Sequence, residues 1–351
     1  MSKLFTELKV GALTLPNRLI MAPLTRSRAP GSGRVPNDLM AQYYAQRATA
    51  GLILTEATSV TPMGIGYANT PGIWTQEQVE GWKKITKAVH DKGGRIFMQL
   101  WHVGRISDPM FLYNELPVAP SAIKPAGHVS LVRPHKEYVT PRALETREIP
   151  GIIESYRKGA ENAKLAGFDG VEIHGANGYL LDQFLHDGSN KRDDQYGGSI
   201  ENRARLHLEV TDAVISVWGA DRVGMHLSPR GDSHDVKDSN PKALFSYLAE
   251  ELGKRKIAFI FAREHEGADS LGEDIKKAFG GVYIANEKYT KETAEKALNS
   301  GFADAVSFGL AYIANPDLLR RFQENLPLNE VDFNTLYAEG EQGYTDYPFF
   351  S

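Results

Sequence analysis

Eight short and nearly continuous apolar runs alternate with longer segments of helical pattern along the 351 residues. The runs predict strands at 18–21, 52–56, 95–100, 170–174, 223–227, 258–261, 282–285 and 305–308. Apolar spacing near 3.6 predicts helices at 38–48, 76–91, 152–166, 199–217, 241–252, 290–299 and 317–324. Strands without polar alternation are typical of a parallel sheet that is covered on both faces. The pattern therefore predicts an α/β protein.

Eight strand–helix units are the number that closes a (β/α)₈ TIM barrel, so we expect residues 1–351 to form one domain of this kind. The alternative is an open doubly wound sheet. Such a sheet normally carries a G-x-G-x-x-G turn after its first strand, and the chain has no such motif.

Two segments fall outside the alternation. Residues 4–15 predict a hairpin that plugs the bottom of the barrel. Residues 104–148 contain six prolines and no helical period, so they predict a long capping insertion after the third strand. The part at 124–147 carries five Lys/Arg and two Glu, which fits either a solvated loop or a docking surface for an anionic substrate or phosphorylated cofactor.

Composition excludes several classes of site. The chain has no cysteine, which rules out disulfides, thiolate metal sites and cysteine nucleophiles. A formal charge of -4 gives no overall basic field for nucleic acid or an anionic membrane. No apolar run approaches the roughly 20 residues that a membrane helix needs, and the N-terminus lacks a secretory pattern. We expect a cytoplasmic protein, monomeric or weakly homo-oligomeric, that acts on a small molecule and holds no metal.

The sharpest chemical signal follows the fourth predicted strand. His174 ends that strand, and Asn177 and Tyr179 follow in a glycine-containing turn. His and Asn offer two neutral donors for one carbonyl or nitro oxygen, and Tyr adds a weak acid. This combination suits the reduction of a polarised double bond. Taken alone, the pattern equally fits a buried structural histidine with a packing tyrosine.

Ordered motifs extend over nearly the whole chain: Met21-Ala-Pro23-Leu-Thr25-Arg, Gln99-Leu-Trp101-His102-Val-Gly104-Arg105, His174-Gly-Ala-Asn177-Gly-Tyr179, Asn190-Lys-Arg192, Ala314-Asn315-Pro316-Asp317 and Gly343-Tyr-Thr-Asp-Tyr347-Pro. Through them the chain resembles the Old Yellow Enzyme family of FMN-dependent ene-reductases, and most closely the bacterial N-ethylmaleimide and xenobiotic reductases. The resemblance implies an NAD(P)H oxidoreductase that reduces activated alkenes, such as enones and maleimides, and also nitroaromatics and nitrate esters. It implies FMN at the barrel mouth, NADPH or NADH as hydride donor and a ping-pong cycle. Tyr179 would be the proton donor, and His174 and Asn177 would polarise the acceptor.

The same resemblance assigns the binding residues. It implies contacts to the flavin ring from Pro23, Leu24, Thr25, Ala57 and Gln99. It implies a phosphate site at Ala285, Asn286, Gly309 and Leu310, and a substrate cavity lined by Tyr67, Trp101 and Tyr344.

Two positions depart from the family pattern. His226 and Leu310 stand where many members carry an arginine, at the flavin ring and at the phosphate respectively. Arg230 and Arg263, each just after a predicted strand, are candidates to supply the missing positive charge. If His226 faces the flavin, reduction of the flavin should raise the pKa of His226, and the redox potential should then fall with pH more steeply around neutrality than the flavin's own protonation explains.

Two other functions compete with the reductase. A cofactor-free lyase or isomerase would use Glu56, Glu172 and His174 as acid–base groups, although no lysine ends a predicted strand to form a Schiff base. A protein that stores flavin without turnover is the second alternative.

Overall fold

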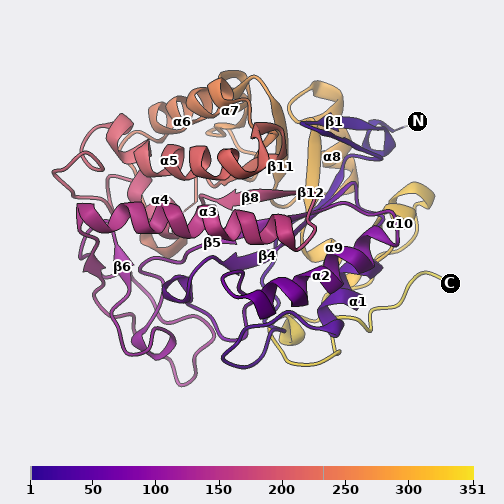
Figure 1. The fold of residues 1–351 in the computed structure, drawn as a ribbon. Coiled ribbons are helices and arrows are strands. Elements are labelled where there is room, and N and C mark those ends of the chain that lie inside the picture. Colours follow the sequence, from indigo (N-terminus) through magenta and orange to yellow (C-terminus); the bar gives the residue numbers. More distant parts are fainter. Residues whose placement is uncertain (1, 232) are drawn as a thin grey trace.

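Eight parallel strands close into a barrel in the computed structural model, which describes residues 2–231 and 233–351 (Figure 1). In spatial order the barrel strands are β3 (Leu19–Met21), β4 (Leu52–Ser59), β5 (Ile96–Trp101), β8 (Gly170–His174), β9 (Val223–Leu227), β10 (Phe259–Arg263), β11 (Val282–Asn286) and β12 (Ala305–Phe308), and β12 pairs with β3. Each of the eight predicted strands is confirmed. The closed barrel excludes the open-sheet alternative.

Helices follow the strands and cover the outside of the barrel. They are α1 (Asp38–Gln46), α2 (Gln76–His90), α3 (Ile149–Leu165), α4 (Leu180–Leu185), α5 (Ile200–Trp218), α6 (Pro241–Arg255), α7 (Gly272–Phe279), α8 (Lys291–Ser300), α9 (Leu310–Ala314) and α10 (Leu318–Glu324). Short 3₁₀ turns lie at Lys3–Phe5, Pro62–Gly64, Pro109–Phe111, Thr146–Glu148, Ala220–Arg222, Ser233–Asp235 and Phe333–Thr335. The seven predicted helices are confirmed, whereas α4, α7 and α9 were not predicted.

At the start of β4, alternate residues face two different apolar layers. On β4, Leu52 and Leu54 belong to the cluster inside the barrel, while Ile53 packs outward in the larger cluster. This is the period of two that a strand imposes. Phe259 also lies inside, and a Cβ at the neighbouring Gly224 would come within 2.2 Å of its ring. Glycine is therefore required there for close packing.

The predicted hairpin closes the amino end of the barrel. Strands β1 (Leu8–Val10) and β2 (Leu13–Leu15) pair antiparallel. Val10 and Leu15 pack with the first residues of barrel strands, including Leu52 and Ala305. Figure 1 shows the hairpin on the right and the capping insertion on the left. The hairpin therefore closes the amino ends of the barrel strands, and the insertion covers their carboxyl ends.

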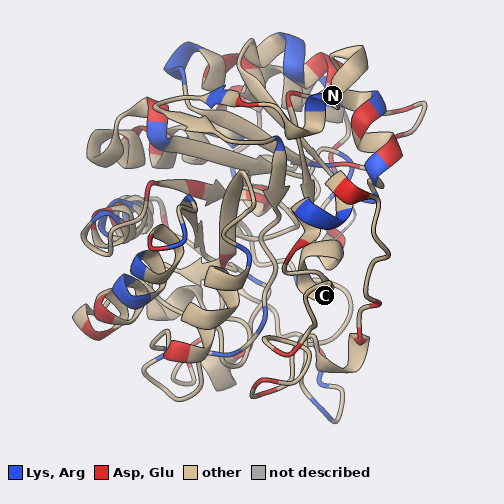
Figure 2. Ribbon diagram, turned by 90° about the vertical axis from the view of Figure 1, so that its right-hand side faces the viewer, with Lys and Arg blue, Asp and Glu red and all other residues tan. Residues whose placement is uncertain are grey.

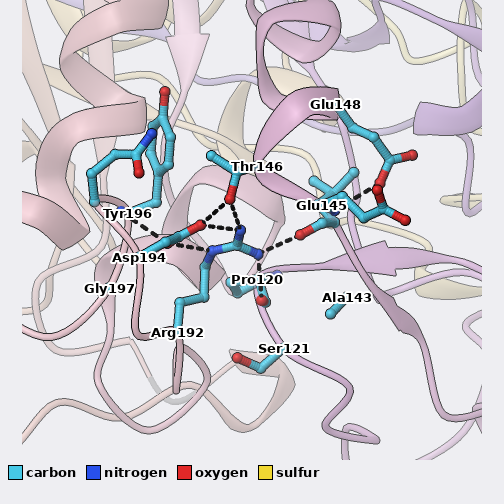
Figure 3. Close-up of polar contacts among 12 residues, drawn as sticks. Pro120, Ser121, Ala143, Glu145, Thr146, Glu148, Arg192, Asp194, Tyr196 and Gly197 are labelled. Carbon is cyan, nitrogen blue, oxygen red and sulfur yellow. Dashed lines mark hydrogen bonds and ion pairs between the residues drawn. The ribbon is translucent and has the colours of Figure 1, made fainter.

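Arg192 fastens the capping insertion, whose short strands are β6 (Val118–Ala119) and β7 (Arg142–Ala143), to the loop before α5 (Figure 3). Its guanidinium donates to the carbonyls of Pro120 at 3.0 Å and Leu144 at 2.5 Å. It also pairs with Asp194, which accepts a further hydrogen bond from Thr146. A planar, charged fork can serve two chain segments and a carboxylate at once. Two separate segments of the insertion, at Pro120 and at Leu144, are thereby tied to one residue.

Most charged residues lie outside the barrel strands, and Glu56 and Glu172 are buried exceptions within them. Figure 2 shows the strands mostly tan, with Lys, Arg, Asp and Glu gathered on the surrounding helices and loops. In the described part of the chain, no helix combines the length and the apolar character that crossing a membrane requires.

Candidate active site

A cavity of about 550 Å³ opens where the barrel strands end, under the capping insertion. Eleven of the residues predicted from the sequence line it: Pro23, Leu24, Thr25, Ala57, Tyr67, Gln99, Trp101, His174, Asn177, Tyr179 and His226. They come from β3, β4, β5, β8 and β9 and the loops that follow these strands, so residues far apart in the sequence meet at one face of the barrel.

The turn after β8 depends on residues that accept a left-handed backbone. Asn177 has φ 56° and Gly178 has φ 75°. Asparagine tolerates this region better than most residues. A Cβ at Gly178 would lie 2.4 Å from the carbonyl oxygen of Ser233. The Asn-Gly pair thus allows the chain to turn sharply and present Asn177 and Tyr179 to the cavity.

Four polar side chains define the chemistry of the cavity wall. The Tyr179 ring lies edge-on to His174, with centroids 5.1 Å apart, and its hydroxyl is 2.7 Å from that of Tyr67. The Oδ1 atom of Asn177 accepts a hydrogen bond from Arg263 at 3.0 Å. This contact turns the amide NH₂ group of Asn177 away from Arg263, where it can donate to a ligand.

Burial keeps these groups in defined protonation states. Desolvation lowers the pKa of His174 to about 3, so its imidazole is neutral at physiological pH. Desolvation also raises the pKa of Tyr179 well above its ordinary value. The cavity therefore holds a neutral histidine donor beside a phenol that keeps its proton.

A bulge in β4 decides which of its residues reaches the cavity. The register with β5 shifts between Leu54 and Ala57, so strict alternation is broken there. Ala57 lines the cavity, whereas Glu56 is buried elsewhere, with its carboxylate 3.2 Å from the Tyr44 hydroxyl. Glu56 and His174 are thus not brought together, and the lyase alternative loses one of its acid–base groups.

Gln99, which lines the cavity, links His226 to the buried Glu172. Its Nε2 atom donates to Oε2 of Glu172 at 2.8 Å and lies 3.0 Å from Nδ1 of His226. Desolvation lowers the pKa of His226 well below its usual value, and the neighbouring His174 and Arg263 lower it further. The ring of His226 is therefore neutral around pH 7 in this structure, and the expected rise of its pKa on reduction of the flavin stays a prediction.

A second hollow of about 550 Å³ adjoins the first and shares Pro23, Leu24, Asn177 and His226 with it. Of the predicted phosphate residues, Asn286, Gly309 and Leu310 line it. Ala285 does not, because alternation along β11 turns it outward into the helix-facing core. Arg263 also lines this hollow, while Arg230 lies in a neighbouring one, paired with Glu264 at 2.7 Å. Of the two candidate cations, only Arg263 is in place.

The prediction that Tyr344 lines the cavity is wrong. Its ring is fully buried and stacked on Tyr43, with centroids 4.1 Å apart. The guanidinium groups of Arg26 and Arg28 lie over it at 5.0 and 4.7 Å. Cation–π contacts and stacking occupy the ring. A different tyrosine of the same segment, Tyr337, lines the cavity instead.

The sequence did not predict which residues of the capping insertion line the cavity. His128, Val129, Ser130, Leu131, Arg133 and His135 all line the cavity. The signal available was the unusual length and basic character of the insertion. These features fitted a solvated loop as well as a binding role, and they did not indicate which side chains would line a site.

The model of the NADH:flavin oxidoreductase / NADH oxidase family matches residues 3–329. Among curated relatives, 12-oxophytodienoate reductase 1 of Oryza sativa subsp. japonica is 46% identical over 363 residues, covering 99% of this chain and 93% of the relative. A flavin oxidoreductase of Emericella nidulans is 43% identical over 380 residues, covering 99% of this chain and 97% of the relative.

Two solved structures of reductases are also similar to this chain. Morphinone reductase in complex with tetrahydroNAD is 50% identical and superimposes with a TM-score of 0.96, covering 100% of this chain and 98% of that one. The old yellow enzyme homologue from Zymomonas mobilis is 46% identical with a TM-score of 0.96, covering 99% of this chain and 100% of that one.

Proposed function

Since the chain belongs to the NADH:flavin oxidoreductase / NADH oxidase family, as its resemblance to the Old Yellow Enzyme family predicted, we propose that it is an FMN-dependent reductase of activated alkenes. Enones and maleimides are the proposed substrates, and nitroaromatics and nitrate esters are further candidates. The observation that carries the proposal is the convergence of His174, Asn177 and Tyr179 on one cavity. The closer resemblance to N-ethylmaleimide and xenobiotic reductases stays a prediction.

The two joined hollows fit FMN. The Nε2 atom of His226 is buried and meets no polar partner among the described residues, although its ring lines both hollows. An unpaired buried polar atom is costly unless a ligand pairs with it. Pro23, Thr25, Ala57 and Gln99 would hold the ring. Asn286, Gly309 and Leu310 would lie at the phosphate, where Arg263 supplies positive charge.

When bound, FMN supplies the two-electron chemistry, taking a hydride from NADH or NADPH and passing it to the β-carbon of the alkene. His174 and Asn177 hold the oxygen that activates the alkene. Both donate as neutral groups, and two donors aimed at one oxygen stabilise the negative charge that develops there. The alkene is thereby kept in one orientation while water is displaced from the cavity.

Tyr179 completes the reaction by donating its hydroxyl proton to the α-carbon. The O–H bond of the phenol breaks as the C–H bond forms, and the phenolate recovers a proton from solvent. The raised pKa of Tyr179 ensures that the proton is present before reaction, and the hydrogen bond with the Tyr67 hydroxyl at 2.7 Å contributes to that rise.

One spectroscopic experiment tests the proposal against both alternatives. The purified protein should be yellow, lose its visible flavin absorbance when NADH or NADPH is added without oxygen, and regain it with cyclohexenone. A colourless protein with no affinity for added FMN would refute the flavin role. A bound flavin that no nicotinamide bleaches would favour flavin storage. Comparing NADH with NADPH at equal concentration identifies the donor.

A further inference from the structure

Three side chains form a buried string in which Gln99 and His226 line the cavity and Glu172 lies outside its lining. Gln99 and Glu172 are register partners on β5 and β8, and His226 lies opposite His174 on β9. All three are at least 96% buried, with exposed fractions of 2%, 0% and 4% for Gln99, Glu172 and His226. Glu172 lies one strand repeat below His174 on the same face, so it is under the cavity and outside its lining.

The string fixes which nitrogen of His226 carries the proton. An amide nitrogen can only donate, so Nδ1 of His226 accepts from Nε2 of Gln99 at 3.0 Å. A neutral imidazole has a single N–H group, which must then be at Nε2. Nε2 is the buried atom that has no partner among the described residues, and the ring lines the cavity.

We propose that Glu172 is a positioning residue that acts through Gln99 to lock His226 as a neutral donor with Nε2–H presented to the ligand. Glu172 Oε2 accepts from the same Gln99 nitrogen at 2.8 Å, which holds the NH₂ group between the carboxylate and the imidazole. The side-chain oxygen of Gln99 is left for a ligand donor. Only the naming of FMN as that ligand rests on the proposed function.

The reversed orientation of the Gln99 amide determines the pH at which the proposal is best tested. If the amide of Gln99 were reversed, its oxygen would face both Glu172 and His226, which would require protons on Glu172 and on Nδ1. Desolvation raises the pKa of Glu172 to about 8, so at pH 9 the carboxylate is ionised and can only accept. The other groups that act on His226 are Arg263 and His174, which is stacked on it with centroids 4.9 Å apart and is neutral at this pH.

The direct measurement is the tautomer of His226 in the ligand-free protein labelled with ¹⁵N-histidine. A long-range ¹H–¹⁵N correlation spectrum at pH 9 should place the proton of His226 on Nε2. A proton on Nδ1 would overturn the proposal. Because no flavin is present, this result does not depend on whether the protein reduces alkenes.

Substitutions then test the part played by Glu172. Glu172→Leu removes the acceptor, so the amide of Gln99 is released and the Nδ1-protonated form of His226 should appear. Glu172→Gln keeps an acceptor oxygen and should restore the wild-type spectrum. A leucine variant whose spectrum is unchanged would refute the role of Glu172. If that variant does not fold, Glu172→Asp, which withdraws the carboxylate by one methylene, gives the same comparison.

Titration with FMN gives the second readout. Loss of one ordered neutral hydrogen bond is worth roughly 0.5–1.5 kcal/mol, which is about a 2- to 10-fold rise in Kd for Glu172→Leu, reversed by Glu172→Gln. A locked tautomer in a protein that binds no FMN would leave this inference standing and refute the proposed function. FMN binding that is equal in all three proteins would refute the link from Glu172 to the ligand.

Discussion

Replacing Tyr179 by Phe should slow transfer from the reduced enzyme to an enone while leaving reduction by the nicotinamide within a few fold. The change removes the hydroxyl and keeps the ring that lies edge-on to His174 and Trp101. Reduction by the nicotinamide needs no acid, whereas the α-carbon of the alkene needs a proton. Losing a general acid costs about 10²–10⁴ in rate, or about 2.7–5.4 kcal/mol of barrier.

The structure places the expected loss in the lower half of that range. The Tyr67 hydroxyl, 2.7 Å from the deleted one, is still present, and water can reach the half-buried position of Tyr179. We therefore expect a slowing of roughly 10²–10³. The matched control is Tyr67→Phe, which leaves the acid in place and should cost less than tenfold. The double variant should be slower than Tyr179→Phe, because both hydroxyls are then gone.

Stopped-flow absorbance measures the two half-reactions separately. Wild-type enzyme, reduced anaerobically and mixed with cyclohexenone, should reoxidise without an alkaline break below about pH 10, since burial raises the pKa of Tyr179 above its usual value near 10. Equal slowing of both half-reactions in Tyr179→Phe would show that the substitution disturbs the cavity as a whole. Unchanged reoxidation would remove Tyr179 as the proton donor.

Three further predictions concern the acceptor clamp, the anchor of the insertion and the second hollow. His174→Ala and Asn177→Ala should each raise the barrier to enone reduction by about 2.7–4 kcal/mol. In the double variant the barrier should rise by less than the sum of the two single effects. Normal enone rates and normal phenol binding in both single variants would refute the clamp. Because the pKa of His174 is about 3, the wild-type rate should show no step near pH 6.5 from its protonation, and such a step would contradict its neutral state. The Arg192 ion pair lowers the pKa of Asp194 to about 2, so its stabilisation is complete above about pH 4 and is lost as the pH falls through 2. Asp194→Asn should therefore lower the free energy of unfolding by about 2 kcal/mol at pH 7, and the difference from wild type should vanish near pH 2. Urea titrations at both pH values measure this difference. An equal loss of stability at both pH values would show that the substitution acts through packing. Arg263→Met removes a charged donor worth about 1.5–3 kcal/mol and should raise the Kd for FMN roughly 10- to 150-fold, measured by flavin fluorescence; unchanged affinity would exclude Arg263 from the cofactor site.

The barrel could be predicted because buried parallel strands leave an unambiguous pattern. Eight apolar runs gave all eight barrel strands within a few residues. The reason for missing a helix differs from one helix to the next. All six residues of α4 (Leu180–Leu185) are buried, so it has no polar face to reveal a helical period. The short α7 begins at Gly272, a weak helix former, after a polar stretch.

The candidate site was predictable only where position along a strand determines position in space. Gln99, His174 and His226 stand at or near strand ends, and strand ends meet at one face of a barrel. Tyr344 and Tyr337 lie seven residues apart in an irregular segment, where no periodicity indicates which ring faces the cavity. Similarly, the exclusion of Glu56 depends on a bulge in β4, and a bulge follows from pairing with β5 that the sequence of β4 alone does not show.

The distribution of charge across the two hollows gives a physical account of the departures at His226 and Leu310. Where the hollows meet, the ring of His226 and the amide of Asn177 are both neutral donors. Arg263 and Lys288 line the second hollow and give it positive charge. Glu287 partly balances this charge, because its Oε1 lies 3.3 Å from Nη2 of Arg263. A ligand with an uncharged ring and an anionic tail is matched at both ends by this arrangement. If FMN binds as proposed, Arg263 would supply at the phosphate the positive charge that Leu310 lacks, and His226 would offer a neutral donor at the ring in place of a cation.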